Sequence, residues 1–151
     1  MKSTYPIWAC ACVLAARAIF AAVFGTAAAF KLAAIHGTAS YIAAAGMPAP
    51  LFLAWVAAFF ELAFVLCFVT GAFFTEAAIA AAAYVLFLGF TFHGPAHWNG
   101  SQAEFGLFVD HFIFVAGLLF AAVHGPGDLL ALSRARLLAR GPVTGRGTAS
   151  L

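Results

Sequence analysis

Long hydrophobic runs, each broken by very few charges, dominate the pattern of this chain. A run of about 20 apolar residues is long enough to cross a bilayer as a helix. Two of the runs hold one charge near their middle, Arg17 in the first and Glu61 in the second. The pattern predicts four transmembrane helices, at about residues 7–30, 50–70, 76–93 and 105–124.

The two central charges, Arg17 and Glu61, predict a contact between the first two spans. A charge at the centre of a bilayer costs on the order of 3 kcal/mol, so it usually faces the bundle interior and a partner. In antiparallel spans with a rise of about 1.5 Å per residue, both residues lie about 15 Å from the same membrane face. We therefore predict an intramembrane ion pair. Such a pair is either a structural clamp between two helices, or a polar contact for a quinone headgroup or part of a proton path.

Turn-forming residues separate the predicted spans. Residues 32–50 contain several glycines and prolines, Gly71 is a natural end for the second helix, and residues 93–104 form a polar loop. After residue 125 the chain becomes rich in arginine. We expect a four-span domain at residues 1–125 and a tail at 126–151, with a short amphipathic surface helix followed by disorder.

Composition supports the same class. Of the 151 residues, 66% are hydrophobic and 8% are charged, too few polar groups to cover a soluble globule. The fold class is therefore all-α, an integral membrane four-helix bundle. A formal net charge of +2 gives no reason to expect nucleic acid as a partner. The 18 phenylalanines provide surface for lipid or for other membrane protein subunits.

The distribution of basic residues predicts the orientation. With four spans, both termini lie on one side of the membrane, and basic residues near span ends favour the cytoplasm. Lys31 is the basic residue expected on the other side, where it can pair with Asp110 for under about 1 kcal/mol. The terminal side carries Lys2, Arg134, Arg136, Arg140 and Arg146. We therefore expect both termini in the cytoplasm and the longer loops outside.

Polar side chains gather on the predicted outer side. They are Lys31, His93, His97, Trp98, Glu104, Asp110 and His111. Imidazole and carboxylate groups suit zinc, copper or iron, so His93, His97 and His111 are candidate ligands of a metal or a haem. However, Pro95 lies between His93 and His97 and disrupts the helix that would align them. The alternative is that these histidines cap helix ends.

The chain lacks the common catalytic motifs, so no catalytic residue is assigned. It has no GxxxxGK[ST], HExxH or GxSxG sequence. The cysteines, Cys10, Cys12 and Cys67, include no CxxC motif. We interpret them as small apolar residues, with a thiol redox centre as the alternative.

The order of these residues resembles the DoxX family of small four-span membrane proteins. The likeness covers about residues 7–120 and rests on Arg17, Gly25, Lys31, the GMPAP segment at 46–50, Glu61, Gly71 and His93. Residues 107–120, LFVDHFIFVAGLLF, are similar to the family's fourth-span motif. Asp110 and His111 stand where that motif usually has Lys and Asn, and Glu76 stands where the third span usually begins with a basic residue.

The resemblance implies a function linked to redox chemistry in a bacterial inner membrane. DoxX relatives are associated with quinone-dependent thiosulfate oxidation and with oxidative or thiol stress. On this basis we expect an accessory subunit of a quinone-linked membrane complex, without a complete active site of its own. The alternative is a noncatalytic assembly subunit, in which the same polar residues only fix the bundle.

Overall fold

A computed structural model describes residues 6–127 and 129–131 of the chain. Within these residues all regular structure is helical. The elements are α1 (Ile7–Ala33), α2 (Ile35–Ala44), α3 (Pro50–Thr70), α4 (Phe74–His93), the short 3₁₀ helix η1 (Pro95–His97) and α5 (Gln102–His124). The expected tail helix falls almost entirely outside the described residues.

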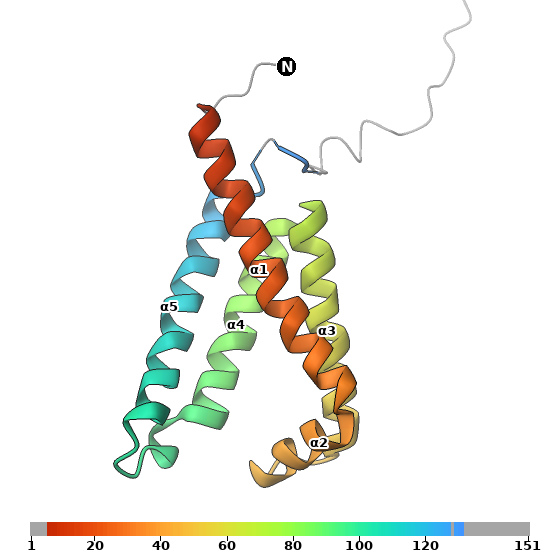
Figure 1. The fold of residues 1–151 in the computed structure, drawn as a ribbon, viewed down its shortest axis with the longest axis vertical. Coiled ribbons are helices and arrows are strands. Elements are labelled where there is room, and N and C mark those ends of the chain that lie inside the picture. The colour runs from red at the N-terminus through yellow and green to blue at the C-terminus, as the bar shows by residue number, and fades with distance from the viewer. Residues whose placement is uncertain (1–5, 128, 132–151) are drawn as a thin grey trace, which may run out of the picture.

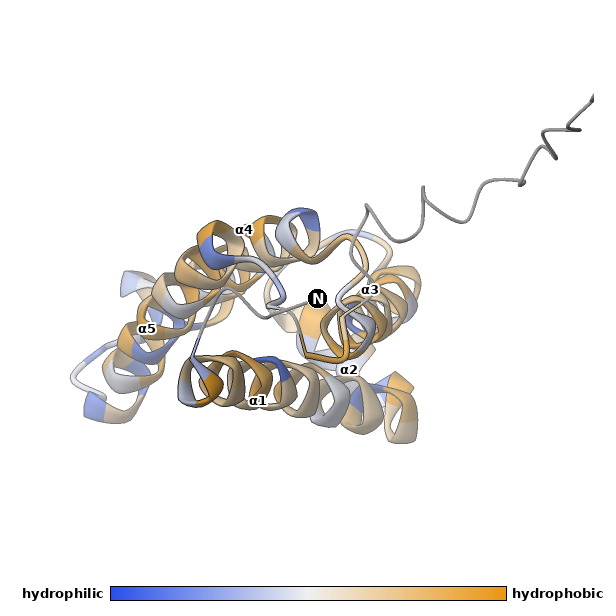
Figure 2. Ribbon diagram, turned by 90° about the horizontal axis from the view of Figure 1, so that it is seen from above, coloured by the Kyte–Doolittle hydropathy of each residue, from blue (hydrophilic) through white to orange (hydrophobic). Residues whose placement is uncertain are grey.

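Four helices, α1, α3, α4 and α5, are long and apolar enough to cross a membrane. They correspond to the four spans expected from the sequence, and the all-α membrane fold class is confirmed. Figure 2 shows these helices mostly in the hydrophobic colours, with polar positions scattered along them. The chain is therefore a multi-pass membrane protein.

The helices pack as two antiparallel pairs, α1 with α3 and α4 with α5 (Figure 1). One end of the bundle, the terminal end, holds the start of α1, the turn between α3 and α4, and the end of α5. The other, the loop end, holds α2 and η1. Figure 1 shows the two pairs close together near the terminal end and spread apart at the loop end.

The main hydrophobic core fills the terminal half of the bundle. Phe20 and Phe24 of α1 pack against Phe64 and Phe68 of α3, with ring centroids 5.1 to 5.9 Å apart. On α4 most of the core residues are small: Ala77, Ala78, Ala81 and Ala82 lie in the core beside Phe74 and Val85. Small side chains let the helices approach closely where no hydrophobic effect drives them together. These alanines lie in the first half of α4, toward the terminal end.

The short helix α2 lies across the loop end. The chain turns at Ala34, so α2 runs at a steep angle to α1 (Figure 1). Ala39 and Ile42 of α2 are buried against Ala54 of α3, and the ring of Tyr41 stacks on Phe92 of α4 at 4.8 Å. The helix therefore bridges the two pairs where they diverge.

The turn between α3 and α4 depends on Gly71, as the sequence predicts. Its φ of 73° is left-handed, and its N–H donates to the carbonyl of Cys67 at 2.8 Å. A Cβ at this position would lie 3.0 Å from the Cβ of Ala131. Glycine therefore allows both the turn and the close approach of the segment that follows α5.

Candidate functional site

Glu61 is a buried carboxylate at the boundary between the core and the wide loop end. Its exposed fraction is 1%. Its Oε1 accepts two hydrogen bonds, from Nζ of Lys31 at 2.8 Å and from the hydroxyl of Tyr84 at 2.9 Å. Its Oε2 is buried and has no hydrogen-bond partner among the described residues. One oxygen of the carboxylate is thus satisfied by the protein, and the other is not.

The predicted Arg17–Glu61 ion pair is wrong. Arg17 is 2% exposed, and among the described residues its guanidinium donates only to main-chain carbonyls. The acceptors are those of Phe68 at 3.0 Å, Val69 at 2.7 Å, Pro126 at 3.2 Å, Leu129 at 2.8 Å and Leu130 at 3.1 Å. Two of them belong to the last turn of α3, where carbonyls lack helical partners and the helix dipole is negative. Arg17 therefore links the end of α3 to the segment after α5 at the terminal end. It lies outside both cavities described below.

The error arose from the height of α1 relative to α3. The prediction placed the ends of both helices at the same level. In the structure α1 has 27 residues and α3 has 21, and the first turns of α1 project beyond the end of α3 (Figure 1). Arg17 is consequently level with Phe68, and Glu61 lies about 10 Å deeper along α3 at a rise of 1.5 Å per residue.

Lys31 replaces Arg17 as the partner of Glu61. Helical side chains point back toward the N-terminus of their helix, so Lys31 at the loop end of α1 reaches inward to the carboxylate. Its side chain is 22% exposed, against 2% for that of Glu61. The expected surface pair of Lys31 with Asp110 is also wrong, since no ion pair joins them in the described structure. Asp110 is exposed and lines the smaller of two cavities.

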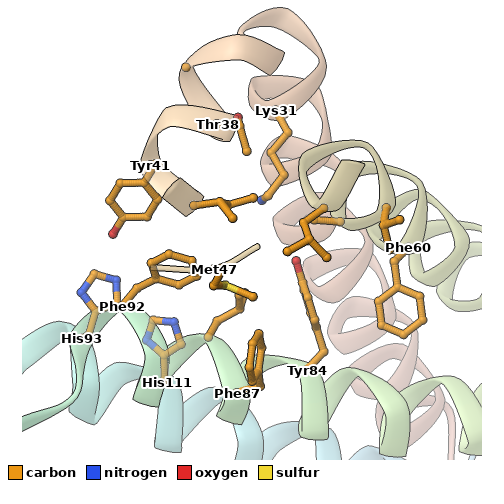
Figure 3. Close-up of a pocket in the computed structure, with 16 residues that line it drawn as sticks. Lys31, Thr38, Tyr41, Met47, Phe60, Tyr84, Phe87, Phe92, His93 and His111 are labelled. Carbon is orange, nitrogen blue, oxygen red and sulfur yellow. The ribbon is translucent and has the colours of Figure 1, made fainter. Parts of the chain in front are cut away.

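The larger cavity, of about 700 Å³, lies between the helix pairs under α2. Apolar side chains form most of its wall, including Met47, Phe60, Phe87 and Phe92. Figure 3 shows Lys31 and Tyr84 toward one side of the cavity, and Tyr41, His93 and His111 toward the other. The site is thus an apolar slot with polar groups at opposite sides.

Tyr41 contributes a hydrogen-bond donor to this cavity. Partial burial and the nearby carboxylate of Glu104 raise the pKa of its phenol above the usual value of 10.0. The hydroxyl therefore remains protonated at neutral pH. In Figure 3 it points toward His93.

The smaller cavity, of about 350 Å³, lies next to the first. Glu61 and Asp110 line only the smaller cavity, not the larger one. The residues that line both cavities are Lys31, Tyr84, Leu88 and His111. Three of these four shared residues are polar, and Lys31 and Tyr84 also hold Oε1 of Glu61. The carboxylate is therefore linked to both cavities by its own hydrogen-bond partners.

The polar side chains that the sequence predicts on the outer side fall into two groups at the loop end. The rings of His93 and His111 lie 5.2 Å apart between centroids, and Nδ1 of His93 is 2.8 Å from Oε2 of Glu104. In contrast, His97 Nε2 lies 3.2 Å from the carbonyl of Thr91, and the indole of Trp98 donates to the carbonyl of His93 at 2.9 Å. The side chains of His97 and Trp98 therefore bind main-chain carbonyls at the end of α4.

The candidate metal ligands do not form a set. No group of three or more His, Cys, Asp or Glu side chains that could hold a metal occurs in the described residues. His93 and His111 come together, whereas His97 is directed to the main chain of α4. Of the cysteines, Cys10 is buried and Cys12 is exposed on the same helix.

A family comparison covers most of this site. The model of the DoxX family matches residues 12–94, which is more than half of the chain. The chain belongs to the DoxX family. The match includes all of α2, α3 and α4 and all of α1 except its first residues. Lys31, Glu61, Tyr84 and His93 of this DoxX protein therefore lie inside it. The resemblance at residues 107–120 lies beyond the match. No curated protein and no solved structure matched the chain.

Sequence reasoning missed Tyr84 and Tyr41. A tyrosine inside an apolar span needs a partner for its hydroxyl, so Tyr84 was a detectable signal for a buried acceptor. Tyr41 gave no comparable signal, because its role depends on α2 lying across the loop end. The position of α2 is a property of the packed bundle.

Proposed function

We propose that this DoxX protein binds a quinone in the larger cavity, as an accessory subunit of a membrane redox system in a bacterial inner membrane. The observation that supports it is the form of the cavity. Ligand sites commonly have volumes of about 300–1,000 Å³, apolar walls and a few convergent polar groups, and this cavity, at about 700 Å³, is of that kind. A quinone has a flat apolar ring with a carbonyl at each of two opposite edges, and an apolar tail.

The polar groups suit the two carbonyls. One of the three N–H donors of Lys31 goes to Glu61, which leaves two for a ligand on that side. On the other side, the Tyr41 hydroxyl offers a donor. Met47, Phe87 and Phe92 provide apolar contact for the ring between them. A bound quinone would carry electrons and protons to and from the redox enzyme with which this protein associates.

A matched pair of substitutions on α3 tests this proposal. Ala57 lines the larger cavity, whereas Ala63 is exposed on the same helix. Ala57→Phe should fill part of the cavity and lower the quinone extracted per protein by about tenfold, equivalent to about 1.4 kcal/mol of binding. Ala63→Phe should leave it at the wild-type level. The measurement is solvent extraction of protein purified in mild detergent, followed by chromatography.

Two results would contradict quinone binding. One is wild-type protein that retains no quinone after purification and acquires none from quinone-loaded vesicles. The other is equal retention by Ala57→Phe and Ala63→Phe. Either result would favour the assembly role, in which the protein packs against other membrane subunits. The exposed apolar residues of α5, among them Phe105, Phe112 and Phe120, would suit that role.

A further inference from the structure

The unpartnered oxygen of Glu61 is the feature that quinone binding leaves unexplained. A buried carboxylate is costly unless it is paired and hydrogen-bonded. Lys31 and Tyr84 both contact Oε1, so Oε2 bears the cost of desolvation without a partner in the described structure. If the residue only clamped the two helices together, a side chain without a second buried oxygen would stabilise the fold better.

The smaller cavity provides a route from Glu61 toward the loop end. Its titratable lining groups come from four helices and are Lys31 of α1, Glu61 of α3, Tyr84 of α4, and Asp110 and His111 of α5. A cavity of about 350 Å³ with several polar groups is roomy enough for water. Water there would give Oε2 of Glu61 a hydrogen-bond donor and would connect it to His111.

His111 is suited to pass protons. Its Nδ1 lies 2.7 Å from the carbonyl of Leu107, so Nδ1 carries the hydrogen and Nε2 is the nitrogen that gains or loses a proton. The ring lies beside that of His93, which is bound to Glu104 near the start of α5. These three residues extend the titratable chain from the smaller cavity to the loop end.

We propose that Glu61 is a proton-exchange site, reached from the loop end through the smaller cavity and His111. The proton that leaves Nε2 of a protonated His111 passes through water and bonds to Oε2, which turns the carboxylate into a neutral acid. His111 regains a proton from water at the loop end, next to His93 and Glu104. The positive charge of Lys31 then remains, and its partly exposed ammonium can be hydrated. No electron is transferred, and the exchange requires no quinone.

Infrared spectroscopy of the full chain in lipid nanodiscs, without added quinone, tests the site itself. On stepwise acidification the wild type should gain a carboxylic acid C=O band that shifts in heavy water. Glu61→Gln should lack this band, and Glu61→Asp should move it. A wild type that stays folded by circular dichroism and shows no band dependent on Glu61 would overturn the proposal.

The route is tested by a matched pair of histidines on α5. His124 also contacts the carbonyl four residues before it, at 3.2 Å, but lines neither cavity. After a jump into heavy water, His111→Phe should slow deuterium exchange of the Glu61 band by about tenfold or more. His124→Phe should exchange at the wild-type rate. Equal rates in these two variants would overturn the route through His111.

A second variant displaces His111 without removing its ring. A Cβ on Gly89 of α4 would lie 3.0 Å from the Cβ of His111, so Gly89→Ala must shift it. This variant should also slow the exchange, and an unchanged rate would contradict the route. Loss of quinone retention in the cavity test would leave these results intact, so the two proposals can fail separately.

Discussion

At the scale of single residues, Arg17 and Glu61 show two ways of burying a charge. Arg17 distributes its five N–H donors over five carbonyls, which suits the planar guanidinium and would suit the point charge of a lysine poorly. Glu61 relies on one cation and one hydroxyl, both at the same oxygen. Arg17 is fully satisfied within the described structure, and Glu61 is poised for a further donor.

These separate environments predict which charged residues are energetically coupled. In double-mutant cycles, Lys31→Met and Glu61→Gln should be non-additive by about 1–3 kcal/mol, because the residues share a contact. Arg17→Lys and Glu61→Gln should add to within about 0.5 kcal/mol. The measurement is the free energy of unfolding in mixed micelles. Strong coupling between Arg17 and Glu61 would mean that the two side chains meet, against the observed geometry.

The loss of Tyr84's hydroxyl should be felt at the same carboxylate. Tyr84→Phe keeps the ring in the aromatic contacts with Phe60 and Phe64 and removes only the donor to Oε1. A hydrogen bond to a charged group contributes about 1.5–3 kcal/mol, so we expect a loss of stability in that range, measured by chemical unfolding. Combined with Glu61→Gln, the loss should become much smaller. A full additive loss in the double variant would show that the hydroxyl stabilises the fold through another partner.

At the scale of elements, the turn between α3 and α4 needs glycine at position 71 for two reasons, its left-handed φ and the close approach of Ala131, and the two can be tested separately. Gly71 and Gly100 both have left-handed φ, 73° and 81° respectively. A Cβ on Gly71 would approach Ala131 at 3.0 Å, whereas nothing lies within 4 Å of one on Gly100. Gly100→Ala should therefore cost only the conformational term of about 1 kcal/mol, and Gly71→Ala should cost clearly more. Thermal melts of the two variants test this, and equal shifts would exclude a role for the packing of Ala131.

The sequence predicted the spanning elements but not their relative height. Run length and hydropathy sufficed for α1, α3, α4 and α5, and glycine chemistry sufficed for the end of α3. The level of α1 against α3 depends on tilt and side-chain packing, which a rise per residue does not contain. For that reason Glu61 was correctly taken as an intramembrane charge needing a partner, yet was paired with Arg17 in place of Lys31. The hydrophobic pattern likewise did not predict that α2 is a helix or that it lies over the cavity.

At the scale of the whole molecule, the site exists because the bundle is unevenly packed. Phenylalanines and alanines bring the helix pairs together in the terminal half, and at the loop end the pairs diverge beneath α2. Glu61 lies where the tight core gives way to the cavities. A polar group at this depth can serve a ligand or a proton path while the terminal half keeps the fold stable. The side of the membrane that the loop end faces then decides which compartment supplies the protons.

The basic residues of the chain predict that this compartment is outside the cytoplasm. In the sequence, Lys2 precedes α1 and the arginines after residue 131 follow α5, whereas Lys31 lies at the loop end of α1, so positive charge favours cytoplasmic termini. A fluorescent protein fused after Leu151 should therefore fluoresce, and alkaline phosphatase fused there should be inactive. Replacing the four tail residues Arg134, Arg136, Arg140 and Arg146 by Gln should weaken this preference. An active phosphatase at Leu151 would instead place the loop end, and with it His111, on the cytoplasmic side, and the proton exchange of Glu61 would then be with the cytoplasm.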